Sequence, residues 1–189
     1  MSSSASPFAA TLDAVSGRVE PEHPLQERRV SDLEGLYADE AAWRSAVDSG
    51  NPLVYTVSAA PVPEEAGEVP FSITSIEPGD VGGELYMTKG HWHTAPEGEV
   101  YAGLSGEGGL LLFDGREHRW IELRPGAAGY IPPGWGHRTV NTGSEPFRFL
   151  AVYPGAAGHD YETVLRDGMG ARVIRTSAGY EVRAREEKA

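Results

Sequence analysis

The sequence predicts an all-β protein, a barrel or sandwich built from many short strands. Glycine and proline account for 24 and 14 of the 189 residues, which favours frequent turns over long helices. From Leu53 onward, short runs rich in β-branched and aromatic residues follow one another, each bounded by turn-forming residues. The chain has the length of one ordinary domain and is long enough to bury a core.

The N-terminal part is predicted to contribute little to that core. Residues 1 to about 20 are small and polar and are expected to form a frayed tail. We therefore assign residues 1–27 to a flexible or extended N-terminal segment and residues 28–189 to a single domain. Near its start, Ser31-Asp-Leu-Glu34 is a capping-box pattern that predicts a short helix or turn. A second short helix is expected from Glu40 to about Ser49, since an aspartate precedes it and a glycine follows it.

The remaining elements are strands, one short helix and a closing hairpin. Alternating or continuous apolar runs bounded by turn residues predict strands at 53–57, 71–76, 84–88, 99–104, 109–113, 119–123, 128–131, 137–140 and 147–153. A short helix is expected at Asp160–Asp167. A hairpin follows, with strands at Arg172–Thr176 and Tyr180–Arg183.

Composition excludes several classes of function. The formal net charge of −12 argues against a nucleic-acid partner, whose phosphates need a basic surface. No apolar run approaches the roughly 20 residues of a membrane span. The chain has no cysteine, so it has neither a disulfide framework nor a thiolate metal site. Its first residues lack the charge and the apolar run of a signal peptide, and we expect a cytoplasmic protein with no membrane partner.

Two short segments carry the residue types of a metal site. In the first segment two histidines stand two positions apart, so on a strand they point to the same face, and a glutamate follows closely. The second segment reads Pro132-x-Gly134-x-x-His137-x-x-x-Asn141. Three imidazoles and a carboxylate suit one divalent first-row ion, and Fe, Mn, Ni, Co and Zn all remain open. The predicted ligands are His91, His93, Glu99 and His137.

Together the two segments match both halves of the cupin signature: His-x-His with a spaced Glu and Gly, then Gly-x5-Pro-x-Gly-x-x-His-x-x-x-Asn. The resemblance implies a double-stranded β-helix, a jelly-roll barrel, with short N-terminal and C-terminal helices. The first segment also offers Glu97, two residues before Glu99. We assign the ligand to Glu99, because Glu-Val-Tyr and the following Gly106 keep the cupin frame.

A closer resemblance covers about residues 28 to 183. The runs Glu84-Leu-Tyr-Met-Thr-Lys-Gly-His-Trp-His93, Glu145-Pro-Phe-x-Phe-Leu-Ala-x-Tyr-Pro154 and Ala157-Gly-His-Asp-Tyr161 are similar to those of the cupin-type glucose-6-phosphate isomerases. The last run is not part of the general cupin signature. The resemblance implies a metal-dependent aldose–ketose isomerase that interconverts glucose 6-phosphate and fructose 6-phosphate. It also implies a homodimer.

The resemblance extends to the substrate pocket. It implies that Tyr55, Thr74 and Thr88, with backbone amides near Gly90 and with Tyr161, contact the phosphate. Tyr101 stands two residues after Glu99, so it faces the same way on a strand and is expected to contact the sugar.

Three residues are assigned to catalysis: Glu99, His159 and Tyr153. Tyr153 ends an apolar strand, and His159 lies in the Gly-His-Asp run before the last helix. Within that motif we interpret His159 as a proton-transfer or hydroxyl-binding residue. A proton shuttle through an enediol needs Glu99 or His159 as base, whereas a hydride shift needs only polarisation by the metal. The acidic run Glu64, Glu65 and Glu68 is interpreted as a solvated loop.

Other functions remain open on the sequence alone. One is another cupin sugar-phosphate isomerase, such as a mannose-6-phosphate isomerase, because the epimeric C2 hydroxyl is a small change. A cupin dioxygenase shares the ligand pattern but has no use for the Gly-His-Asp-Tyr run. A non-catalytic sugar-binding cupin is the alternative outside the enzymes.

Overall fold

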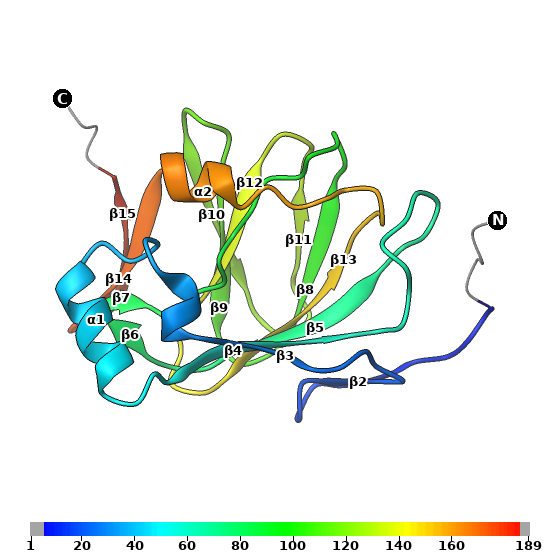
Figure 1. The fold of residues 1–189 in the computed structure, drawn as a ribbon, viewed down its shortest axis with the longest axis horizontal. Coiled ribbons are helices and arrows are strands. Elements are labelled where there is room, and N and C mark those ends of the chain that lie inside the picture. Colours follow the sequence, from blue (N-terminus) through cyan, green and yellow to red (C-terminus); the bar gives the residue numbers. More distant parts are fainter. Residues whose placement is uncertain (1–5, 186–189) are drawn as a thin grey trace.

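Antiparallel sheets form a barrel in the computed structural model, which describes residues 6–185 (Figure 1). The largest sheet has six strands in the order β11 (Ala128–Ile131), β8 (Glu99–Ser105), β13 (Phe147–Val152), β5 (Phe71–Ile76), β4 (Leu53–Ala59) and β3 (Gln26–Arg29). A three-stranded sheet has the order β10 (His118–Leu123), β9 (Gly108–Phe113) and β12 (Gly136–Asn141). A four-stranded sheet has the order β15 (Gly179–Ala184), β14 (Ala171–Thr176), β7 (Glu84–Leu85) and β6 (Asp80–Val81).

The segment after β7 joins the smaller sheets. Met87 pairs with Val140, and His91 pairs with His137, both in antiparallel bridges to β12. One apolar core fills the barrel, with Ile76, Leu110 and Phe147 fully buried from three different strands. The predicted jelly-roll class is therefore confirmed. None of the described helices is long and apolar enough to cross a membrane.

The helices are short and lie outside the barrel (Figure 1). The 3₁₀ helix η1 (Val30–Leu33) and helix α1 (Glu40–Asp48) follow β3, close to the predicted positions. Asp39 caps α1, because its carboxylate accepts a hydrogen bond from the Ala42 N–H at 2.9 Å. Helix α2 (Glu162–Asp167) begins two residues later than predicted. The Asp160 carboxylate lies before the helix and accepts hydrogen bonds from the N–H and the hydroxyl of Thr163 in its first turn.

The predicted strands are found, with one shortened. The expected strand over residues 84–88 is regular only at Glu84–Leu85, and the chain beyond it makes isolated bridges. The backbone at Gly90 has φ +74°, which a regular strand cannot contain.

The expected frayed tail is wrong over residues 11–20. Strands β1 (Thr11–Asp13) and β2 (Arg18–Glu20) form a hairpin, seen beside the barrel in Figure 1. Val19 is fully buried against Ile73, and its N–H donates to Ser58 Oγ at 2.9 Å. Strand β3 also begins before the predicted domain boundary at residue 28. That boundary stays a prediction, and residues 1–5 lie outside the described residues.

Candidate metal centre and pocket

The four predicted metal ligands lie together inside the barrel. Glu99 opens β8 and His137 is the second residue of β12, while the two other histidines lie on the segment after β7. One ligand atom from each of the four lies within 4.8 Å of the others. The group is His91, His93, Glu99 and His137.

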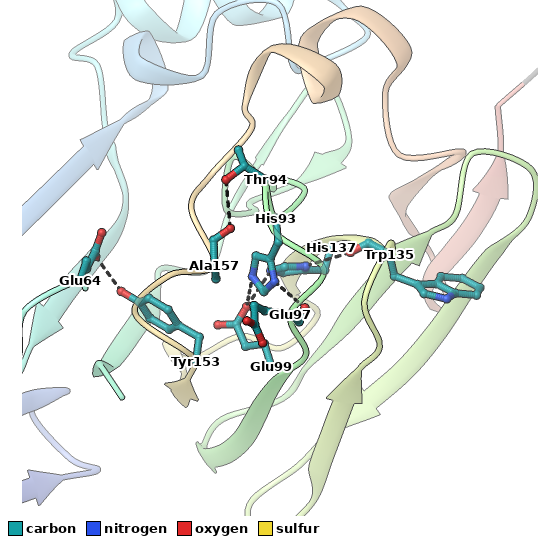
Figure 2. Close-up of polar contacts among 9 residues, drawn as sticks. All are labelled: Glu64, His93, Thr94, Glu97, Glu99, Trp135, His137, Tyr153 and Ala157. Carbon is teal, nitrogen blue, oxygen red and sulfur yellow. Dashed lines mark hydrogen bonds and ion pairs between the residues drawn. The ribbon is translucent and has the colours of Figure 1, made fainter. Parts of the chain in front are cut away.

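Backbone carbonyls hold two of the imidazoles in place (Figure 2). Nδ1 of His93 lies 2.8 Å from the Glu97 carbonyl, and Nδ1 of His137 lies 3.3 Å from the Trp135 carbonyl. A carbonyl only accepts hydrogen bonds, so each Nδ1 carries a proton, and the neutral form of each ring has its lone pair on Nε2. That tautomer is the one a metal ligand needs. Glu97 thus contributes its backbone, and Glu99 contributes its carboxylate.

The residues present fit a divalent cation. The Nε2 atoms of His91 and His137 are buried without a hydrogen-bond partner in the described structure. Glu99 Oε2 lies 3.2 Å from His93 Nε2 and 3.0 Å from His137 Nε2, and only the first contact has hydrogen-bond geometry. A cation held by these nitrogens and this oxygen would satisfy the unpartnered Nε2 atoms of His91 and His137.

The charge states of His91 and Glu99 also suit a metal site. Burial lowers the pKa of His91 well below its ordinary value, so this imidazole is neutral at pH 7. Burial alone raises the pKa of Glu99, but the contacts with His137 and His93 outweigh burial and lower it, so this carboxylate is ionised. Neutral imidazole and ionised carboxylate are the forms that bind a metal. Burial alone lowers the pKa of His93, but its contacts with Glu99 and Glu97 outweigh burial and raise it, so a metal would compete with a proton at this ring.

A cavity of about 320 Å³ opens onto this cluster. Ligands His91, Glu99 and His137 are part of its lining, whereas His93 is not among the lining residues. Every residue predicted to bind substrate also lines it, namely Tyr55, Thr74, Thr88, Gly90, Tyr101 and Tyr161. Their catalytic or binding roles stay predictions, but the structure brings all of them to one cavity.

The loop before α2 carries His159 to the metal ligands. Trp92 and Asp160 exchange backbone hydrogen bonds of 3.2 and 2.8 Å, so this loop runs alongside the ligand segment. The His159 ring centroid lies 4.5 Å from that of His91, and the ring stacks on Tyr161 at 5.9 Å with a 7° interplanar angle. Burial lowers the pKa of His159, although the charges of Glu64 and Glu99 oppose it.

Glu64 lies in an exposed loop, as predicted, but its carboxylate also takes part in the cavity. Glu64 lines the cavity, and the Tyr153 hydroxyl donates a hydrogen bond to its Oε1 at 2.8 Å (Figure 2). Gln26 and Lys89 line the cavity as well and were not predicted. Lys89 lies between Thr88 and Gly90, which were both predicted to bind substrate, so its place at the cavity could have been predicted from the sequence. Nothing in the sequence brings Glu64 to Tyr153.

A jelly-roll barrel with a buried cluster of three histidines and a glutamate at its cavity defines the metal-binding cupin class. The family model described as glucose-6-phosphate isomerase matches residues 27–189. The chain is 45% identical to the glucose-6-phosphate isomerase of Thermococcus litoralis, over 89% of each chain. It is 44% identical to that of Pyrococcus horikoshii, over 93% of this chain and 94% of the relative. The chain belongs to this glucose-6-phosphate isomerase family.

Solved structures of Bacillus subtilis oxalate decarboxylase are also similar to the chain. One is 25% identical with a TM-score of 0.44, and it matches 53% of this chain and 26% of that chain. Another, at pH 4.6, is 24% identical with a TM-score of 0.43 over 56% of this chain. The chain spans about a quarter of the length of these structures.

Proposed function

We propose that this chain is a metal-dependent aldose–ketose isomerase that interconverts glucose 6-phosphate and fructose 6-phosphate. One observation carries the proposal: the cluster of metal ligands and the hydroxyls and amides suited to a phosphate line the same cavity. The cavity has room for one sugar phosphate. The relatives that match this chain over almost its whole length are named glucose-6-phosphate isomerase.

The reaction moves hydrogen between C1 and C2 of the open-chain sugar. A divalent first-row ion held by the four ligands supplies Lewis-acid polarisation of the carbonyl. Glu99 and His159 are the candidates for holding or moving the proton at C1 and C2. Burial raises the pKa of Tyr101 far above its ordinary value, and its contact with Glu99 adds to the effect, so the hydroxyl stays protonated and orients the carboxylate. Tyr153 is proposed to contact a sugar hydroxyl from the end of β13, the strand next to β8.

The other end of the cavity is proposed to bind the phosphate. Burial raises the pKa of Tyr55 to about 12, although its contact with the Lys89 backbone opposes the shift, so Tyr55 remains a hydrogen-bond donor. Thr88 Oγ1 accepts the Thr139 N–H at 3.1 Å, so its own proton can be donated, either to Thr139 Oγ1 at 3.5 Å or to an anion. Thr74, Tyr161 and the amide of Gly90 add further hydrogen-bond donors. Together these groups can bind the phosphate without a cluster of arginines in the cavity lining.

The test is the formation of fructose 6-phosphate by the metal-loaded protein. Glucose 6-phosphate and mannose 6-phosphate are supplied in parallel in heavy water, and products are analysed by mass spectrometry. Turnover of glucose 6-phosphate supports the proposal, and deuterium in the product favours the proton shuttle over the hydride shift. Turnover of mannose 6-phosphate alone, or of neither sugar, overturns it.

Two further expectations accompany this function. A homodimer is proposed, since Tyr130 and Val100 are register partners on β11 and β8 and remain 60% and 41% exposed on the barrel surface. Sedimentation that shows only monomer at working concentration overturns it.

A cytoplasmic location is proposed because that compartment holds the sugar phosphates of glycolysis.

A further inference from the structure

The cavity wall contains an irregularity next to a metal ligand. Thr88 donates its N–H to the Thr139 carbonyl, and His91 exchanges backbone hydrogen bonds with His137. Between these pairs, Lys89 and Gly90 therefore face the single residue Arg138. Two residues opposite one is the pattern of a β-bulge, and bulges next to active sites turn backbone groups toward the site.

The Arg138 side chain holds this bulge from behind. Its Nη2 and Nε donate to the Lys89 carbonyl at 2.7 and 3.3 Å. The Lys89–Gly90 peptide is trans, so its C=O and N–H point in opposite directions. Because the carbonyl points outward to Arg138, the Gly90 N–H points inward to the cavity.

That N–H has no partner in residues 6–185, although Gly90 is buried. A buried donor without a partner is unfavourable unless a ligand or water satisfies it. Only glycine fits at this position. A Cβ would come within 2.9 Å of the His137 carbonyl and 3.2 Å of Arg138 Nε, at a φ of +74°.

Arg138 also places a positive charge behind the donor. The residue is only 4% exposed, and Glu84, the acidic group with the largest charge interaction with Arg138, is held by Arg172 at 2.7 Å. Lys89 is also one of the residues that line the cavity. In a chain of net charge −12, this end of the cavity is the one suited to an anion.

We infer that Arg138 is a positioning residue for the phosphate: it fixes the Lys89–Gly90 peptide with the Gly90 N–H aimed at the phosphate and adds a buried positive charge behind it. Arg138 does not touch the substrate. It selects phosphorylated over neutral sugars without acting at C1 or C2. The inference rests on the proposed function, since it assigns the anion at this site to the phosphate of the sugar.

The experiment compares R138M, R138K and the matched control R172M, all loaded with metal. Arg172 belongs to the same charged cluster, through Glu84 and the Leu36 carbonyl, but it makes no contact with Lys89. Calorimetry measures binding of glucitol 6-phosphate, which has no carbonyl and cannot react, and of inorganic phosphate. Kinetics measures KM and kcat for glucose 6-phosphate, and metal content and circular dichroism are recorded for each variant.

R138M is expected to bind both phosphate compounds about 10- to 100-fold more weakly, the scale of losing a charge-assisted contact. Its KM should rise by a similar factor while kcat stays within about threefold, because the metal end is intact. R138K keeps the charge but has no planar fork, so its loss should be intermediate. R172M should bind within about threefold of the parent.

Parent-like binding by folded R138M overturns the inference, and so does an equal loss in R172M. If R138M does not fold, R138K decides, because parent-like binding by R138K contradicts the need for the forked contact. A parent protein that binds glucitol 6-phosphate but never isomerises glucose 6-phosphate refutes the proposed function alone. The binding data on Arg138 stand in that case.

Discussion

The two ends of the cavity are built in different ways. The metal end takes its ligands from two short segments, and carbonyls within two to four residues of the histidines fix two of the rings. The proposed phosphate end is assembled from β4, β5, the bulge after β7 and the loop before α2, which are far apart in sequence. The metal end is therefore encoded by local spacing, whereas the phosphate end depends on how strands meet.

The largest effect is expected at the metal end. Removing the metal with a chelator should abolish isomerase activity, and adding a divalent ion should restore it, because the carbonyl then regains its Lewis acid. His137→Ala should lose metal occupancy together with turnover, since three remaining ligands bind a first-row ion weakly. Metal content by plasma emission and activity are measured on one preparation. Full activity in metal-free protein would show that the reaction does not need a metal at this cluster.

A sharper test separates the two glutamates of the ligand segment. Glu99→Gln should reduce kcat by at least roughly 10²-fold, because it removes a ligand and a candidate base. Glu97→Gln should be nearly silent, since the carbonyl of Glu97 holds His93 and its side chain has no assigned role. Steady-state kinetics at saturating metal ranks the variants. The reverse order would mean that the ligand segment is out of register.

His159 tests whether the chemistry extends beyond the ligands. His159→Gln should keep the fold and the metal content but lower kcat by roughly 10²- to 10⁴-fold, the scale of losing a positioned acid or base. The exposed His23 provides the matched control, because His23→Gln should leave kcat unchanged. Parent-like turnover by the His159 variant would assign the proton transfer to Glu99.

The same contrast explains what could be predicted from the sequence. The His-x-His spacing and the Pro-x-Gly-x-x-His turn are local patterns, so all four proposed ligands could be named before the structure was known. The predicted strands from Leu53 onward could be placed for the same reason, because alternation and turn residues are local. The shortened strand at residues 84–88 is the exception, since the bulge depends on what Lys89 and Gly90 meet across the barrel.

Tertiary contacts account for what was missed. Val19 looked dispensable in a polar tail, but it is buried because β5 offers Ile73 to the N-terminal hairpin. Arg138 follows a ligand histidine and by strand alternation faces away from the cavity, yet it reaches the bulge from behind. Glu64 lies 89 residues from Tyr153, and no spacing rule connects them.

At the phosphate end, Gly90→Ala is expected to act mainly on binding. The added methyl group would displace the Lys89–Gly90 peptide, and KM for glucose 6-phosphate should rise about tenfold, the loss of one charge-assisted hydrogen bond. Gly126→Ala is the control, because its φ of +86° is similar but nothing lies within 4 Å of its Cβ. Both variants should lose about 1–2 kcal/mol of stability from backbone strain. If KM rises equally in both, strain rather than the lost donor explains the effect.

The smallest effect is expected at the mouth of the cavity, where Glu64 meets Tyr153. The exposed Glu64 carboxylate orients the Tyr153 hydroxyl, whose pKa is raised by burial and by this hydrogen bond, so the tyrosine stays protonated. Glu64→Gln keeps an acceptor but removes its charge, and a partly exposed neutral hydrogen bond contributes only about 1 kcal/mol. We therefore expect a change in kcat/KM of about two- to fivefold, with metal content unchanged. Glu68→Gln, in the same acidic loop but outside the cavity lining, should show no change. Equal kinetics for the parent and the Glu64 variant would mean that the hydrogen bond from Tyr153 to Glu64 does not affect the reaction.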